Sequence, residues 1–75
     1  MERYRNLGGD SGVSAYEIGA DYIKVEFTSG SLYLYNYGSA GIQHIERMKE
    51  LAIAGEGLNS FINRYVRKAY ALKLR

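Results

Sequence analysis

Apolar and aromatic residues alternate with polar ones along three short stretches in the first half of the chain. These stretches, residues 13–18, 22–28 and 31–37, are rich in the β-branched and aromatic residues that favour strands. Residues 19–21 (Gly-Ala-Asp) fit a three-residue hairpin loop. Residues 29–30 (Ser-Gly) fit a two-residue loop in which glycine supplies a positive φ. The pattern predicts a three-stranded antiparallel β-meander.

The predicted loop lengths set the strand register and the two faces of the sheet. The register pairs Thr28 with Ser31, Phe27 with Leu32, Val25 with Leu34 and Ile23 with Asn36. Side chains alternate between the faces of a strand, so one face is predicted to be aliphatic and the other rich in tyrosine. The aliphatic face, which we expect to form the core, carries Val13, Ala15, Ile23, Val25, Phe27, Leu32 and Leu34. The tyrosine-rich face carries Tyr16, Tyr22, Lys24, Glu26, Tyr33, Tyr35 and Tyr37.

After Gly38 the apolar spacing changes to three or four residues, the period of a helix. The first helix has Ser39 as its expected N-cap and ends near Ala54, before the Gly-Glu-Gly of residues 55–57. Its apolar stripe is Ile42, Ile45, Met48 and either Leu51 or Ala52. The stripe of the second helix is Leu58, Phe61, Ile62, Tyr65, Val66, Ala69 and Leu72. Both stripes can cover the aliphatic sheet face, which predicts a two-layer α+β fold of order β-β-β-α-α.

Residues 1–12 mix charges with three glycines and show no periodicity, so we expect a flexible leader. Residues 13–75 are predicted to form a single domain, because a chain of 75 residues has room for only one hydrophobic core. The chain has no cysteine and therefore no disulfide. Its charged start, and the lack of an apolar run long enough for a signal peptide or a membrane span, favour a cytoplasmic location and no membrane partner.

The residue types needed for the common catalytic and metal sites are scarce. His44 is the only histidine, and the acidic residues show no spacing typical of a metal site. A catalytic triad would need His44 with a distant serine and carboxylate. A carboxylate pair such as Glu26 and Glu46 would need a substrate cleft, for which so short a chain offers little room. We therefore expect no enzymatic activity, no metal and no cofactor.

Two sequence motifs in fixed order resemble those of a known family. Tyr33-Leu34-Tyr35 lies in the third predicted strand, and a pattern G-x3-F-x-N-x2-[IV]-R-x2-Y follows later in the chain. The residues that match it are Gly57, Phe61, Asn63, Val66, Arg67 and Tyr70. In this order the chain resembles the KTSC domain, a short family named for its occurrence at the C-terminus of some lysyl-tRNA synthetases and also found as small stand-alone proteins. The resemblance runs from about residue 10 to residue 70 and implies the stand-alone form.

The chain departs from the family pattern at two places. Residues 38–40 are Gly-Ser-Ala where the family has a proline, and the first turn lacks the usual tyrosine. We therefore expect the start of the first helix to differ. The resemblance implies no established biochemical activity. It suggests RNA binding through the association of the family with tRNA synthetases, which is an argument by analogy.

Tyrosines and basic residues form the candidate binding surface. Single-stranded bases stack on strand aromatics in other RNA-binding sheets while nearby cations hold the phosphates. Net charge is only +2, but residues 64–75 contain five basic residues and no acidic one. The candidate RNA-binding residues are Tyr33, Tyr35, Tyr37 and Lys24 on the sheet and Arg64, Arg67 and Lys68 on the second helix. The expected partner is single-stranded RNA or tRNA.

Other interpretations of the same residues stay open. Tyrosine is a good strand residue on a half-exposed face, where its ring packs across strands and its hydroxyl meets water. The tyrosine-rich face is equally suited to a protein partner or a homodimer, because tyrosine is enriched at protein interfaces. The helix cations can complement the helix dipole, pair with Glu46 or Glu50, or remain hydrated.

Overall fold

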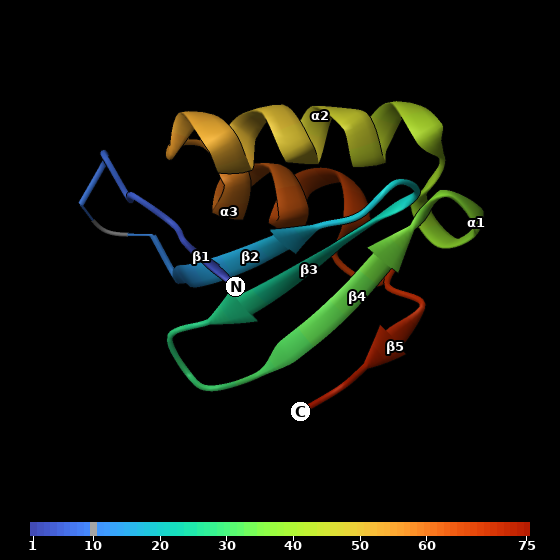
Figure 1. Ribbon diagram of the computed structural model, residues 1–75, viewed down its shortest axis with the longest axis horizontal. Coiled ribbons are helices and arrows are strands. Elements are labelled where there is room, and N and C mark those ends of the chain that lie inside the picture. The colour runs from blue at the N-terminus through green and yellow to red at the C-terminus, as the bar shows by residue number, and fades with distance from the viewer. Residues whose placement is uncertain (10) are drawn as a thin grey trace.

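The protein is a five-stranded antiparallel sheet with its helices on one side, as the computed structural model of residues 1–9 and 11–75 shows (Figure 1). The strands cross the sheet in chain order, β1-β2-β3-β4-β5. The elements are β1 (Glu2–Arg3), β2 (Val13–Ile18), β3 (Tyr22–Phe27), β4 (Leu32–Asn36), α1 (Tyr37–Ala40), α2 (Ile42–Ala54), α3 (Leu58–Phe61), η1 (Ile62–Val66) and β5 (Leu72–Lys73). The predicted α+β class and central meander are confirmed, and the sheet has two further strands at its edges.

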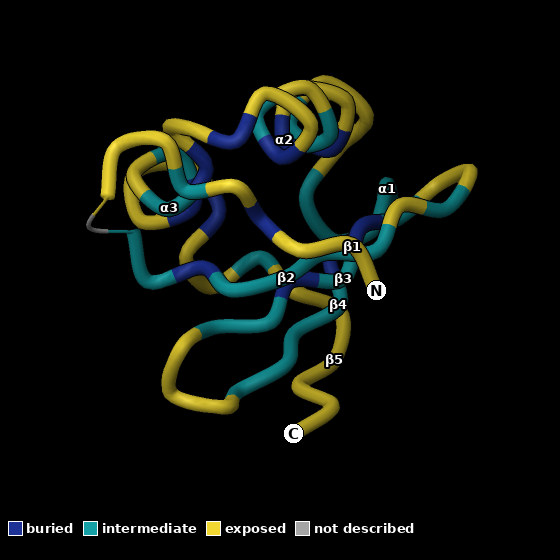
Figure 2. The backbone as a smooth tube through the Cα atoms, turned by 60° about the vertical axis from the view of Figure 1, so that its left-hand side comes forward, coloured by how far each residue is buried: buried dark blue, intermediate teal, exposed yellow. Residues whose placement is uncertain are grey.

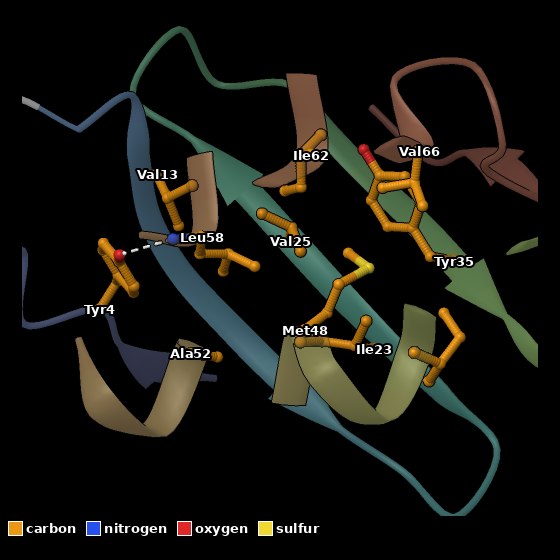
Figure 3. Close-up of a cluster of buried hydrophobic side chains, with 11 residues drawn as sticks. Tyr4, Val13, Ile23, Val25, Tyr35, Met48, Ala52, Leu58, Ile62 and Val66 are labelled. Atoms are coloured by element: carbon orange, nitrogen blue, oxygen red, sulfur yellow. Dashed lines mark hydrogen bonds between the residues drawn. The ribbon is translucent and has the colours of Figure 1, made fainter. Parts of the chain in front are cut away.

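The N-terminal segment belongs to the fold, so the predicted flexible leader is wrong. Strand β1 pairs with β2 at one edge of the sheet. Tyr4 follows with only 3% of its surface exposed, and its hydroxyl accepts a hydrogen bond from the Leu58 backbone N–H at 3.3 Å (Figure 3). A two-residue strand is too short to show a period in the sequence. Asp10, where the family resemblance begins, lies outside the described residues.

The two hairpin loops differ in length from those predicted. Gly19 donates its backbone N–H to the Tyr22 carbonyl at 3.0 Å, which leaves a two-residue loop at residues 20–21. In the second hairpin, the Phe27 N–H donates to the Ser31 carbonyl at 2.8 Å and the Gly30 N–H to the Phe27 carbonyl at 2.9 Å. Gly30 has a φ of 95°, which glycine adopts at little cost. The second loop therefore contains three residues, 28–30, a common alternative to the two-residue turn.

This loop shifts the register of β3 against β4 by one residue and exchanges the faces of β4. Val25 lies opposite Tyr33 and Ile23 opposite Tyr35, and cross-strand partners share a face. Tyr33 and Tyr35 therefore face the helices, and Tyr35 is only 2% exposed. The two leucines of β4 face the open side of the sheet. The predicted separation of a tyrosine-rich face from the core is wrong, because a one-residue slip turns every side chain of a strand over.

A bulge in β2 determines which of its residues face the helices. Val13 lies opposite Phe27 but Ala15 opposite Glu26, so the register shifts between them. A bulge of this kind adds one residue to one strand and reverses the alternation locally. Val13 is buried as predicted, whereas Tyr16 packs against the core and Ala15 lies opposite Glu26 on the open face, the reverse of the prediction.

Ser39, the predicted N-cap of the first helix, lies inside a separate short helix. Asn36 caps α1: its Oδ1 accepts from the Ser39 N–H at 2.8 Å, and Ser39 Oγ accepts from the Asn36 N–H at 3.1 Å. This reciprocal arrangement satisfies two backbone donors. Tyr37 consequently starts α1 instead of continuing β4, and Gly41, with a φ of 91°, separates α1 from α2.

Helix α2 matches its prediction closely. Its buried residues are Ile45, Met48 and Ala52, three or four apart, whereas Ile42 at its start is exposed. Gly55 ends the helix with a φ of 79° and donates its N–H to the Leu51 carbonyl at 2.9 Å. This left-handed glycine cap is a common helix end.

The second helical segment consists of α3 and η1 in direct succession and is shorter than predicted. Leu58, Ile62 and Val66 are buried at a spacing of four residues. The predicted continuation of the stripe to Leu72 is wrong, because residues 72–73 form β5 and pair with β4. The outer edge of β4 would otherwise present unpaired backbone groups, which β5 satisfies.

The core lies between the sheet and the two longer helical segments, and buried residues occupy their facing sides (Figures 2 and 3). Its members are Tyr4, Val13, Ile23, Val25, Tyr35, Ile45, Met48, Ala52, Leu58, Ile62 and Val66. None is charged, so the core is held by apolar burial at about 25 cal/mol per Å².

Removing the Tyr4 ring tests whether the N-terminal segment stabilises the fold. We expect Tyr4→Ala to lower the free energy of unfolding by about 3–5 kcal/mol, the usual cost of deleting a buried aromatic ring. Tyr4→Phe keeps the ring but leaves the buried Leu58 N–H without its acceptor, so its cost should be about 1–3 kcal/mol. Urea denaturation followed by circular dichroism measures both. Equal stability of Tyr4→Ala and the wild type would show that the segment is a leader after all.

Candidate functional site

A pocket of about 370 Å³ lies between the β3–β4 hairpin and the helical segment η1. Its residues come from the end of β3, the hairpin loop, β4 and η1, together with a glycine that precedes β2. The lining residues are Gly12, Phe27, Thr28, Ser29, Ser31, Tyr33, Tyr35, Ile62, Asn63 and Arg67. The Tyr-x-Tyr strand and the later G-x3-F pattern thus meet in space, although about thirty residues of chain separate them.

An aromatic cluster forms one side of the pocket. The Tyr33 and Tyr70 ring centroids are 4.7 Å apart at an interplanar angle of 64°, and Phe27 meets Tyr33 edge-to-face at 5.8 Å. Tyr70 also meets Tyr35 edge-to-face at 6.5 Å. Edge-to-face and tilted geometries are those that aromatic rings prefer. Tyr70 is 38% exposed, so this cluster reaches the surface.

Two basic side chains accompany the aromatic cluster. Arg67 lines the pocket from the residue after η1, and Lys73 on β5 lies opposite Tyr33, with its Nζ 5.8 Å from the Tyr33 ring centroid. Both side chains are exposed. Neither forms an ion pair with any residue in the described part of the chain. We call the pocket, together with Tyr70 and Lys73, the aromatic-basic pocket.

Tyr35 is the most deeply buried residue that lines this pocket. The ring extends from β4 toward Ile62 and Val66, with the hydroxyl at its far end (Figure 3). Burial raises the pKa of Tyr35 to about 12, and the neighbouring Tyr33 and Tyr70 hydroxyls add to the shift. The group is therefore neutral at physiological pH and able to donate a hydrogen bond. It makes no hydrogen bond within residues 1–9 and 11–75.

Tyr37 and Lys24, two of the predicted binding residues, lie elsewhere. The Tyr37 hydroxyl donates to Glu46 at 2.7 Å, which raises the pKa of Tyr37. Lys49 pairs with Glu46 at 2.8 Å, and the two hydrogen bonds together lower the pKa of this carboxyl, the one from Lys49 having the larger effect. Lys24 points to the open sheet face, where its Nζ lies 3.5 Å from Glu17. These two side chains serve the local structure of α1–α2 and of the open face.

The three predicted helix cations do not share one site. Only Arg67 lines the pocket. The Arg64 guanidinium carbon lies 5.6 Å from the Tyr65 ring centroid on the exposed surface of η1. Lys68 is exposed beyond the end of η1. Of the seven predicted residues, the structure therefore brings together Tyr33, Tyr35 and Arg67.

Among the residues of the aromatic-basic pocket that the prediction missed are Asn63, Tyr70 and Lys73. Asn63 and Tyr70 carried a signal, since both belong to the same pattern as Arg67. Nothing in the sequence marked Lys73, because its place beside Tyr33 depends on the pairing of β5 with β4.

No family model, curated protein or solved structure matched the chain, so the resemblance to the KTSC domain stays a prediction. Within the described residues, no cluster of three or more His, Cys, Asp or Glu side chains is arranged to hold a metal ion. The described helices are all too short or too polar to span a membrane.

The raised pKa of Tyr35 predicts late ionisation of one tyrosine and a matching loss of stability in alkali. Below pH 10 both folded and unfolded states keep this phenol protonated, so it does not affect stability there. Between pH 10 and about 12 the unfolded state loses the proton first, so unfolding becomes more favourable. Tyrosine ring-carbon chemical shifts followed against pH, with Tyr35→Phe for assignment, measure the pKa. Ionisation of Tyr35 near pH 10 would contradict this geometry.

Proposed function

We propose that this protein is a small non-catalytic binding module that takes RNA, single-stranded or as tRNA, at the aromatic-basic pocket. The observation that carries the proposal is that two exposed cations without acidic partners in the described chain accompany Tyr33: Arg67 lines the same pocket, and Lys73 Nζ lies 5.8 Å from the Tyr33 ring centroid. Guanidinium and ammonium groups bind phosphates, and aromatic rings accept stacked bases. KTSC membership, which we also propose, points to the same partner class.

The chemistry of the pocket lining favours binding over catalysis. The described residues that line it include hydroxyl, amide and guanidinium groups but no carboxylate, histidine or cysteine. A serine or threonine hydroxyl needs a neighbouring base to act as a nucleophile. The lining has donors for an anion and an aromatic side for a base, which suits recognition of a nucleotide unit.

The RNA proposal predicts binding that depends on salt and on Arg67. We expect a fluorescently labelled single-stranded RNA to bind at low salt and to weaken steeply as salt rises, because phosphate contacts release counterions. Arg67→Gln and Lys73→Gln should each weaken binding about tenfold, the effect of one charge-assisted contact.

Arg47→Gln provides the matched control for this titration. It removes one equal charge from an exposed site on α2 that pairs with Glu50, so its effect should be much smaller. Labelled tRNA serves as a second probe. Affinity that is unchanged between low and high salt, or equal losses in all three variants, would argue against a specific phosphate site.

A second candidate function is protein interaction, and a different surface favours it. Three leucines, Leu32 and Leu34 of β4 and Leu72 of β5, project from the sheet face away from the helices, and Leu74 follows directly after β5, with its backbone N–H bonded to the Leu32 carbonyl. We call this set the leucine face. Leu72 is 55% and Leu74 43% exposed. Contiguous exposed apolar side chains are typical of protein interfaces, whereas of the tyrosines first considered for this role Tyr35 is buried and Tyr33 packs against Phe27 and Tyr70.

The leucine face predicts self-association at high protein concentration. We expect sedimentation equilibrium to show a reversible dimer that Leu72→Lys abolishes, because a charge in an apolar interface is costly to bury. Ile53→Lys is the matched control, since Ile53 is equally exposed but lies on α2. A monomeric wild type across the accessible concentration range would remove the homodimer.

A further inference from the structure

The size of the aromatic-basic pocket limits what it can hold. At about 370 Å³ it lies near the lower end of the range for small-molecule sites, roughly 300–1,000 Å³. That space suits one nucleotide unit and not a stretch of strand. Any longer RNA would therefore place one unit in the pocket and pass over the surface around it.

The buried and half-buried side chains that line the pocket are mainly apolar and aromatic. Ile62, Phe27 and Tyr33 supply the walls, and Tyr35 supplies the hydroxyl. Tyr35 lines the pocket with only 2% of its surface exposed, and its hydroxyl has no hydrogen-bond partner within the described residues. A tyrosine hydroxyl both donates and accepts hydrogen bonds, so this group is available to bond a ligand atom in the pocket.

The rim of the pocket differs from its interior. Arg67 and Asn63 are exposed there, together with the hydroxyls of the hairpin loop, and Lys73 lies behind Tyr33. Positive charge thus lies at the opening and apolar surface inside. A nucleotide has the same division, with a charged phosphate at one end and a flat base at the other.

We infer that the aromatic-basic pocket binds one unpaired nucleotide, with its base inserted against Tyr33 and its phosphate held at the rim by Arg67. The neutral Tyr35 hydroxyl donates a hydrogen bond to an acceptor atom on the base edge. The inference rests on the proposed RNA function and adds that a single base enters the pocket and is bound at its edge by Tyr35. A free mononucleotide and a nucleotide within a strand share this chemistry.

The test compares three probes on the full chain: a single-stranded RNA hexamer, the same strand with all bases removed, and a free mononucleotide such as UMP or AMP. We expect removal of the bases to weaken binding about tenfold or more, since each stacked base contributes substantially. Tyr35→Phe should weaken the intact strand about fivefold, the effect of one lost hydrogen bond, and leave the baseless strand unchanged.

Tyr35→Phe is a suitable variant because the hydroxyl that it removes has no partner within the described residues, so the fold should persist. Thermal unfolding checks this. Tyr37→Phe is the matched control: it deletes a hydroxyl from the residue two positions further on, which bonds Glu46 and does not line the pocket. It should bind all probes like the wild type. Amide chemical shifts of Ile62 and Asn63 report whether the base enters.

Each outcome decides between the two proposals. Equal affinity for the intact and the baseless strand would overturn the inserted base while leaving electrostatic RNA binding in place. Binding of the mononucleotide alone, sensitive to Tyr35→Phe, would support the pocket and make its ligand a free nucleotide. Binding of none of the three at low salt would overturn both the RNA function and this inference.

Discussion

The whole arrangement depends on the three-residue loop that joins β3 to β4. Gly30, at a φ of 95°, closes this loop and sets Ile23 opposite Tyr35 and Val25 opposite Tyr33. Because side chains alternate along a strand, this register alone turns both tyrosines toward the helices. With a loop one residue shorter, the leucines of β4 would enter the core and the tyrosines would face solvent. The core and the aromatic cluster are therefore consequences of one turn.

Strand β4 positions the residues of the site in two ways, through its helix-facing side chains and through its outer edge. Its helix-facing side chains pack against η1, where Ile62 and Val66 meet Tyr35 in the core (Figure 3). Its outer edge pairs with β5, and this pairing brings Lys73 beside Tyr33. The chain between η1 and β5 must turn back at this point, and Tyr70 in that turn packs on Tyr33. Aromatic and basic groups are thus neighbours because two distant segments converge on one strand.

The candidate site was predicted in part and for a partly wrong reason. Tyr33, Tyr35 and Arg67 do meet, as the proposed binding surface required, but they meet in a pocket beneath the helices and not on an open tyrosine-rich face. Tyr37 lies outside the pocket because the cap formed by Asn36 and Ser39 starts a helix where the strand was expected to continue. Lys24 also lies outside the pocket, because its side chain projects from the sheet face opposite to that of Tyr33 and Tyr35. In each case the position of the side chain depends on a local contact or on the strand register, and neither can be deduced from the residue type alone.

Elements with local signals could be predicted from the sequence alone. Periodicity and turn residues, which depend on neighbours in the chain, predicted three strands, α2 with its buried stripe and terminal glycine, and the α+β class. The loop lengths, the face of each β4 residue and the pairing of β1 and β5 at the sheet edges depend instead on the tertiary structure. Those features arise from pairing and burial between distant residues. The two-residue strands β1 and β5 and the single buried Tyr4 are too short to produce a periodic pattern in the sequence. They are stabilised by the segments against which they pair or pack.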